Sequence, residues 1–252
     1  MKKATSDNIP KVGIFDSGIG GFSVLKEVRG KTQADILYFG DCARAPYGNR
    51  SSAEILLFIE EIVSNLKKQD VTHFVSACNS MSVMMTNIML QDCGIDEVNY
   101  VDMVRAFKEY STFSKEDVVL VVGTHVTIQS GVYQEALIEK HVSVDEYVFK
   151  TLAGLIERDG EYDDIYDVIE QGILHAKKVD ATHIVYGCTH YPLVDEIFKD
   201  CAKKNDWNGV FVDPAYYVGE AVAKWNLLGG RETFFEASEV TKPFSQLAST
   251  YK

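Results

Sequence analysis

Two cysteines lie in a repeated segment, and this repeat is the strongest chemical signal in the chain. Residues 67–80 read KKQDVTHFVSACNS and residues 177–190 read KKVDATHIVYGCTH, an offset of 110 residues. Each copy predicts a helix end, a turn, a buried strand and a loop that carries a cysteine. Two such units predict two related lobes. If the lobes face each other, Cys78 and Cys188 lie across one substrate-sized gap, where two thiols can move a proton across a carbon centre.

Further polar residues follow other predicted strands. In open α/β sheets, ligands bind beyond the carboxyl ends of the strands. Five loops leave such ends with polar side chains or tight turns: Asp16-Ser17, Pro46-Tyr47-Gly48, Cys78-Asn79-Ser80, Gly123-Thr124 and Cys188-Thr189-His190. Their clustering predicts a single functional site.

Both cysteines are predicted at the start of a helix, where the partial positive charge favours thiolate over thiol. Asp16 and His190 are the candidates to orient and tune the two sulfurs, although Asp16 could instead cap the next helix. Exposed N–H groups at the helix starts can hold a carboxylate. The polar side chains that can assist them are Asn79, Ser80, Ser17 and Thr189.

Structural roles are the alternative for several of these residue types. Cysteine is often a small buried residue, which is the expected role of Cys42, Cys93 and Cys201. His73 and His183 precede strands and are also expected to be structural. A zinc site built from Cys78, Cys188 and His190 is a further alternative, without a close-spaced cysteine pair to support it. The turn at residues 18–21 is only a weak phosphate-binding signal, because no Gly-Lys-Ser/Thr follows it.

The composition excludes some classes of protein. The chain has 252 residues, 46% of them hydrophobic and 25% charged, which is typical of a globular protein. Its formal charge of −12 argues against a broad nucleic-acid interface, which needs a basic face. The first residues lack the apolar region of a signal peptide, and no apolar run reaches the ~20 residues of a membrane span. Five cysteines, an odd number, suit a reducing cytoplasm.

The elements that must position these residues alternate between strands and helices, which predicts parallel sheets. Strands are expected at 11–15, 35–39, 72–77, 98–103, 118–122, 142–148, 182–186, 209–212 and 233–236. Ser51 and Glu54 form a capping-box pattern before a helix. Other helices are expected at 79–92, 129–140, 150–158, 161–178, 215–228 and 239–250, with one more after Cys188. The predicted fold is α/β, with two pseudo-symmetric lobes (1–103 plus 218–252, and 104–217) and the site in the cleft between them.

Five segments together resemble the bacterial glutamate racemases of the aspartate/glutamate racemase superfamily. They are VGIFDSGIGGFSVLKEV, YFGDCARAPYGNRS, SACNS, GTHVTIQSGVY and GCTHYPL, in this order from about residue 12 to 215. The resemblance implies a cofactor-independent enzyme that interconverts L- and D-glutamate to supply D-glutamate for peptidoglycan. It also implies two pseudo-symmetric lobes, usually in a homodimer.

By this resemblance, Cys78 and Cys188 are the two acid/base thiols, with Asp16 assisting the first and His190 the second. The residues implied to hold the substrate are Ser17, Pro46, Tyr47, Gly48, Asn79, Ser80, Thr124 and Thr189. Glu157 aligns with an acidic residue of the family near the substrate amino group.

The chain departs from the family pattern at the pocket wall and the lobe interface. The departures are Ser80 in place of threonine, Met81 in place of a small residue, His125-Val126, Val101 to Arg105, and Lys150 to Ala153. They leave open a racemase of aspartate or another amino acid, or a ligand-binding protein without turnover. A redox sensor with a Cys78–Cys188 disulfide is a third alternative.

Overall fold

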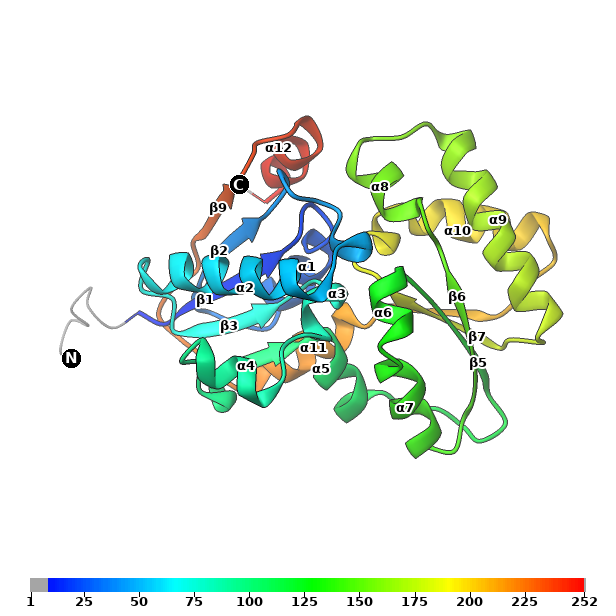
Figure 1. Cartoon of the computed structure of the whole chain (residues 1–252), viewed down its shortest axis with the longest axis horizontal. Coiled ribbons are helices and arrows are strands. Elements are labelled where there is room, and N and C mark those ends of the chain that lie inside the picture. Colours follow the sequence, from blue (N-terminus) through cyan, green and yellow to red (C-terminus); the bar gives the residue numbers. More distant parts are fainter. Residues whose placement is uncertain (1–8, 252) are drawn as a thin grey trace.

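The computed structural model of the chain describes residues 9–251, so residues 1–8 of its polar leader lie outside the description. Two lobes lie side by side, and each is a parallel β-sheet flanked by helices (Figure 1). This confirms the predicted α/β fold with two lobes. Among the described residues, no helix combines the length and the apolar character that crossing a membrane requires.

The first sheet has five parallel strands in the order β4-β3-β1-β2-β9. Their bounds are β1 Lys11–Asp16, β2 Asp35–Gly40, β3 His73–Ser76, β4 Tyr100–Asp102 and β9 Thr233–Ala237. All but the first residue of β1 are buried, as expected for a parallel strand covered on both faces. Because β9 pairs with β2, the C-terminal segment lies with the first lobe.

The second sheet has four parallel strands in the order β6-β5-β7-β8. They are β5 Val118–Gly123, β6 Ser143–Val148, β7 His183–Gly187 and β8 Val210–Val212. This order repeats the order β2-β1-β3-β4 of the first sheet, so the lobes share one topology. The residue bounds that we drew between the lobes stay a prediction.

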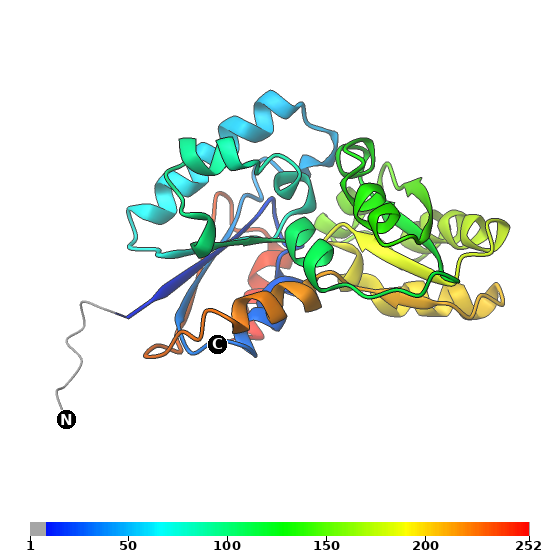
Figure 2. The same ribbon diagram turned by 90° about the horizontal axis from the view of Figure 1, so that it is seen from below.

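Helices cover both faces of the first sheet. Figure 2 shows α2 and α4 on one side, and α11 and α12 on the other. The helices of this lobe are α1 Phe22–Arg29, α2 Ser52–Lys67, α3 Asn79–Ser82, α4 Asn87–Asp92, α11 Ala215–Ala223 and α12 Lys242–Ser249, with 3-10 turns η2 Tyr47–Asn49 and η3 Glu97–Asn99. Alternate residues of β1 face opposite layers, since Ile14 packs in the core with α1 and Phe15 in the core with α2.

The second sheet is covered in the same way. Val121 of β5 packs with Leu137 of α7, whereas Leu120 packs with Ile169 of α9 on the other face. The elements of this lobe are α5 Met103–Tyr110, α6 His125–Gln129, α7 Val132–Glu139, α8 Leu152–Glu157, α9 Tyr162–Lys178, α10 Asp195–Lys204 and the 3-10 turn η4 Tyr191–Val194.

The sequence repeat has the same backbone geometry in both lobes. Helices α2 and α9 end in the Lys-Lys pairs, and Asp70 and Asp180 then adopt left-handed backbone conformations, with φ of 61° and 52°. Strands β3 and β7 start at His73 and His183, whose rings lie beside the preceding threonines. The structural roles expected for the two histidines agree with these contacts.

Several predicted helices are shorter or divided. The helix expected at 79–92 is divided because Thr86 caps a new helix, its side chain accepting from the Met89 N–H. The helix expected at 129–140 starts only at Val132, after Gly131 with its φ of 69°, and a separate short helix, α6, precedes it at His125–Gln129. The helix expected at 215–228 ends at Ala223, and Asn226 has a positive φ. The capping box of Ser51 and Glu54 is confirmed.

Candidate active site

The polar loops predicted to cluster do meet where the carboxyl ends of the two sheets face each other. Several hydrogen bonds cross between the lobes there: Thr189 Oγ1 to Asp16 Oδ2 (3.1 Å), Tyr133 OH to Asn79 Oδ1 (2.5 Å), Ile19 N to Glu157 Oε2 (3.1 Å), and Ser80 Oγ with Thr124 Oγ1 (3.2 Å). The polar side chains in these bonds are buried. The two halves of the repeat therefore contribute to one polar interior region.

Cys78 lies at the N-cap of α3, directly after β3, and is 5% exposed. Its thiol lies 3.5 Å from Ser17 Oγ, to which it donates. Burial, and then the charge of Asp16, raise the pKa of Cys78 to about 12. Burial therefore opposes the thiolate form that we predicted for this sulfur, because the loss of solvation disfavours the charged form.

Cys188 follows β7 and is also 5% exposed. It precedes the 3-10 turn η4 and not an α-helix, which corrects the expected helix start. Its sulfur lies 3.7 Å from His190 Nδ1. Cys188 is among the charges that raise the pKa of Cys78, so the two thiols lie within electrostatic reach of each other.

Glu157 supports His190 from the opposite side of the imidazole. Its Oε2 lies 2.6 Å from His190 Nε2 and also accepts the Ile19 N–H. Burial lowers the pKa of His190, but hydrogen bonds with Cys188 and Glu157 raise it more, so the pKa lies well above its ordinary value. Thiol, imidazole and carboxylate form a continuous chain. In this chain the carboxylate orients the imidazole, and the imidazole contacts the sulfur.

Asp16 ends β1 and is fully buried between the lobes. One carboxylate oxygen accepts the Gly18 N–H at 2.9 Å, and the other accepts the Thr189 hydroxyl. Burial raises the pKa of Asp16, and the charge of His190 opposes that shift. Asp16 therefore links the loop before α1 to the loop that carries Cys188. The turn at residues 18–21 has its Gly18 and Ile19 N–H groups taken by Asp16 and Glu157, which does not favour a phosphate site.

The loop that holds Pro46, Tyr47 and Gly48 lies between the lobes. The backbone of Gly48 approaches Thr124 so closely that a Cβ added there would lie 2.5 Å from the threonine Cβ. The Tyr47 ring is buried, and its hydroxyl donates to Asp41. This loop therefore closes one side of the polar region.

Two tyrosines at the site were missed in the sequence. Tyr133 donates to Asn79 Oδ1, and Tyr191 lies beside Cys188, whose charge adds to burial in raising the pKa of the Tyr191 phenol. The only signal for Tyr191 was its place directly after Cys188-Thr189-His190. Buried polar atoms without a partner among residues 9–251 include Asn79 Nδ2, Tyr191 OH and Glu157 Oε1. Such atoms are available to a polar ligand.

The departures from the family pattern lie in different environments. Met81 is fully buried in the core beneath α2, whereas His125 and Lys150 are exposed. Arg105 pairs with Asp102 and with the exposed Glu97. Of these four departures, Met81 therefore lies deepest, three residues after Cys78.

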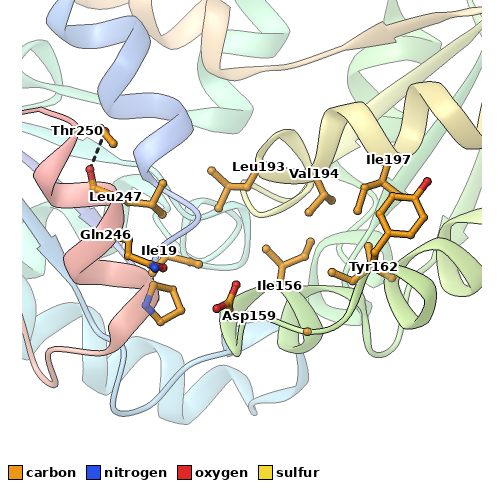
Figure 3. A pocket seen from close by; sticks show the side chains of 13 residues that line it. Ile19, Ile156, Asp159, Tyr162, Leu193, Val194, Ile197, Gln246, Leu247 and Thr250 are labelled. Atoms are coloured by element: carbon orange, nitrogen blue, oxygen red, sulfur yellow. Dashed lines mark hydrogen bonds between the residues drawn. The ribbon is translucent and has the colours of Figure 1, made fainter.

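Neither sulfur lines any of the four cavities described in residues 9–251, and the expected substrate-sized gap between Cys78 and Cys188 stays a prediction. One of them, of about 420 Å³, lies between the lobes, with Leu247 and Gln246 of α12 facing Ile156 and Leu193 (Figure 3). It is lined mostly by apolar side chains and contains neither thiol. Cys78 and Cys188 are each only 5% exposed in this arrangement of the lobes.

The five cysteines are all free, so the alternative disulfide is not formed here. Cys42 and Cys201 are buried, as expected for structural thiols, whereas Cys93 is only partly buried. Within residues 9–251, no group of three histidine, cysteine or acidic side chains has the arrangement of a metal site. The zinc alternative therefore has no ligand set in the described part of the chain.

Comparison with individual known proteins identifies relatives of the chain, although no protein-family model matches it. The glutamate racemase 3 of Caldanaerobacter subterraneus subsp. tengcongensis is 32% identical over 250 residues, which cover 94% of this chain and 89% of that protein.

Solved structures show the same likeness. The glutamate racemase isoform RacE1 from Bacillus anthracis has a TM-score of 0.82 at 25% identity, covering 96% of this chain and 93% of that one. The glutamate racemase from Francisella tularensis in complex with D-glutamate has a TM-score of 0.80 at 26% identity, covering 97% and 94%. Both sequence and fold are therefore similar to glutamate racemases over nearly the whole length.

Proposed function

The chain belongs to the glutamate racemase family, and we propose that it interconverts L- and D-glutamate with Cys78 and Cys188 as acid and base. The observation that supports this most is the meeting of the duplicated cysteine loops at one buried polar region. The relative from Francisella tularensis binds D-glutamate, which supports glutamate as the substrate here.

The proposed reaction moves one proton off the α-carbon and another onto it. One sulfur, as thiolate, takes the α-proton and becomes a thiol, and the C–H electron pair stays on the carbon. The opposite thiol then donates its proton to the other face and becomes a thiolate. Atoms and charge balance within the enzyme–substrate complex, and the reverse turnover restores the starting state.

The two thiols start in different environments. A pKa of about 12 keeps Cys78 as a thiol in the closed structure at neutral pH, so it begins as the proton donor. Cys188 begins as the base, beside a His190 whose raised pKa favours the imidazolium. A neighbouring imidazolium favours a thiolate. Asp16 and the Glu157–His190 pair then assist the two sulfurs.

The remaining polar residues are proposed to hold glutamate and to stabilise the developing carbanion. The residues in this role are Ser17, Pro46, Tyr47, Gly48, Asn79, Ser80, Thr124, Thr189 and Glu157. Glu157 keeps one oxygen without a partner among residues 9–251, and this oxygen suits the substrate ammonium group. Preorganised donors in a water-excluded site stabilise charge far better than water does.

The test is solvent deuterium incorporation during turnover. With either enantiomer of glutamate in D₂O and no added cofactor, the product should carry deuterium at Cα, because its proton comes from the second thiol. Cys78→Ser and Cys188→Ser should each lower racemisation by about 10³-fold or more, since a serine hydroxyl ionises far less readily than a thiol and therefore neither donates nor accepts the proton well.

Cys93→Ser is the matched control, because Cys93 is a partly buried thiol on the far end of α4. It should leave the rate of racemisation unchanged. Normal racemisation in both active-site variants would rule out the two-thiol mechanism.

A different amino acid is the main alternative for the substrate, because Met81 is buried near Cys78 where the family has a small residue. Racemisation of a panel of L- and D-amino acids, followed by circular dichroism, separates the cases. Turnover of aspartate or alanine at a higher kcat/KM than glutamate would overturn the assignment. Binding without turnover would indicate a ligand-binding protein.

We further propose that the enzyme works in the cytoplasm as a homodimer and supplies D-glutamate for peptidoglycan, as the family resemblance implies. Five free cysteines suit a reducing compartment. No nucleic-acid or membrane partner is proposed, given the formal charge of −12. Rescue of a D-glutamate auxotroph tests the cellular role, and light scattering tests the dimer.

A further inference from the structure

Two strands of the first sheet lead into the same four-residue unit, an aspartate followed three residues later by an arginine. Asp41 follows β2 and pairs with Arg44 at 2.5 Å, whereas Asp102 ends β4 and pairs with Arg105 at 3.3 Å. Both carboxylates are buried, and each arginine also contacts an aromatic ring and a second carboxylate. Because the two units share the same spacing and the same kinds of contact, one can serve as the control for the other.

The two aspartates have different partners. Asp102 caps α5 by accepting the Arg105 N–H at 2.8 Å. Asp41 starts no helix, and its Oδ2 instead accepts the Tyr47 hydroxyl together with Arg44 Nε. One unit therefore supports a helix, and the other supports the loop that carries Tyr47.

The backbone and the buried side chain of Asp41 are both fixed by the surrounding structure. Its N–H donates to the backbone oxygen of Asp16 at 3.0 Å, which ties it to the end of β1. Its side chain is fully buried, and Oδ1 has no partner among residues 9–251. A buried carboxylate is stabilised only by its partners, so Asp41 strongly favours a geometry in which Tyr47 and Arg44 both reach it.

The partners of Asp41 are packed against α2. The Tyr47 ring lies 5.2 Å from the Phe58 ring, and the Arg44 guanidinium lies 4.0 Å above the same ring. Directly after Tyr47, Gly48 meets Thr124 of the other lobe with no room for a side chain. A small displacement of Tyr47 would therefore change how this loop meets the second lobe.

We propose that Asp41 is a positioning residue: through Tyr47 and Arg44 it sets the place of the 46–48 loop against Thr124, and so the affinity for substrate. The inference rests on the proposed function, in which this loop contacts glutamate. Asp41 itself touches neither thiol in the described structure, so its effect should appear in substrate binding more than in the chemical step.

Asp41→Asn keeps the size of the side chain but removes the charge that Tyr47 and Arg44 share. We expect KM for glutamate to rise about tenfold, with kcat changed less than about threefold, because loop placement affects substrate and transition state alike. Tyr47→Phe removes the same hydrogen bond from its other end and keeps the ring. It should raise KM by a similar factor.

The double variant tests whether Asp41 acts through Tyr47. Residues that act through one contact are not additive, so the double variant should raise KM about tenfold and not about a hundredfold. Asp102→Asn is the matched control, with an equally buried carboxylate and the same arginine spacing. Its KM should stay within about twofold of the wild-type value.

Amide hydrogen exchange gives a readout that needs no activity. In Asp41→Asn, the Arg50 amide, which donates to Tyr47 O, should exchange faster, and in Asp102→Asn it should not. Unchanged KM and exchange in Asp41→Asn, or additive effects in the double variant, would overturn the positioning role. If the wild-type enzyme fails to racemise glutamate, the proposed function fails, while the exchange result still decides whether Asp41 holds the loop.

Discussion

At the scale of single residues, Glu157 has a role beyond the one that the family resemblance implied, which was a place near the substrate amino group. One of its oxygens contacts His190 Nε2 and accepts the Ile19 N–H. Glu157 thereby supports the imidazolium form of His190, whose pKa lies well above its ordinary value. The other oxygen keeps no partner among residues 9–251.

Replacing this carboxylate should move the pH dependence of the enzyme. Glu157→Gln removes a charge that raises the pKa of His190, so the imidazolium is lost at lower pH. We expect the alkaline limb of kcat/KM to shift down by about one pH unit or more, with kcat about 10–100-fold lower. Rates measured from pH 6 to pH 10 would show both effects.

Glu170→Gln is the control, because Glu170 lies on α9 and contacts Asn205 outside the site. It should keep the wild-type profile. A Glu157→Gln profile with the wild-type alkaline limb would show that the carboxylate does not control the protonation of His190.

At the scale of elements, an aspartate follows or ends the last strand of each repeated topology and precedes a helix. Asp102 ends β4 directly before α5, and Asp213 lies between β8 and α11. Burial raises the pKa of each to about 6. The two positions lie 111 residues apart, close to the offset of the cysteine repeat, so the duplication extends to the connections.

The raised pKa of Asp102 predicts how stability depends on pH. The carboxyl group of Asp102 binds its proton more tightly in the folded state than in the unfolded state. Protonation of Asp102 therefore stabilises the fold fully below pH ~4, and this contribution is lost as the pH rises through about 6. The variant Asp102→Asn has no titratable group at this position, and its amide oxygen can still accept the Arg105 N–H at the start of α5. Between pH 4 and pH 7.5, the free energy of unfolding of the variant should rise relative to wild type by about 2–3 kcal/mol.

Urea denaturation at several pH values measures this difference. The Asp96→Asn variant serves as the control, since Asp96 also caps a short helix but is exposed. Parallel pH curves for wild type and Asp102→Asn would show that Asp102 titrates alike in the folded and unfolded chain.

At the scale of the whole molecule, the lobes are closed over the two thiols. Hydrogen bonds from Thr189 to Asp16 and from Tyr133 to Asn79 cross between them, and an ion pair joins Lys242 to Asp159 at 3.0 Å. Closure excludes water, which strengthens electrostatic interactions inside the site. We therefore expect substrate entry and product release to involve opening of the lobes.

The closed arrangement predicts an order of thiol modification. With iodoacetamide under native conditions, Cys93 should react first, because Cys78 and Cys188 are each only 5% exposed. D-glutamate should slow modification of the two active-site thiols further and leave Cys93 unchanged. Peptide mass spectrometry against time gives each rate. Equal rates for all three cysteines would show that the closed form does not predominate in solution.

Much of this protein could be predicted from its sequence because the signals are local. Alternating apolar runs and turn residues determine which segments are strands or helices, so the α/β order and the duplicated lobes were evident. The capping box at Ser51 was evident for the same reason. The division of residues 79–92 was not, because the apolar pattern continues through Thr86 and hides the new cap.

The sequence by itself also determined which side chains we propose as acid and base, since the repeat singles out Cys78 and Cys188 from five cysteines. Only the tertiary structure decided their environments. Glu157 meets His190 from 33 residues away, and Asp16 meets Thr189 from 173 residues away. The pKa of Cys78 rises because solvation depends on what packs over a sulfur, and that covering comes from segments distant in the chain.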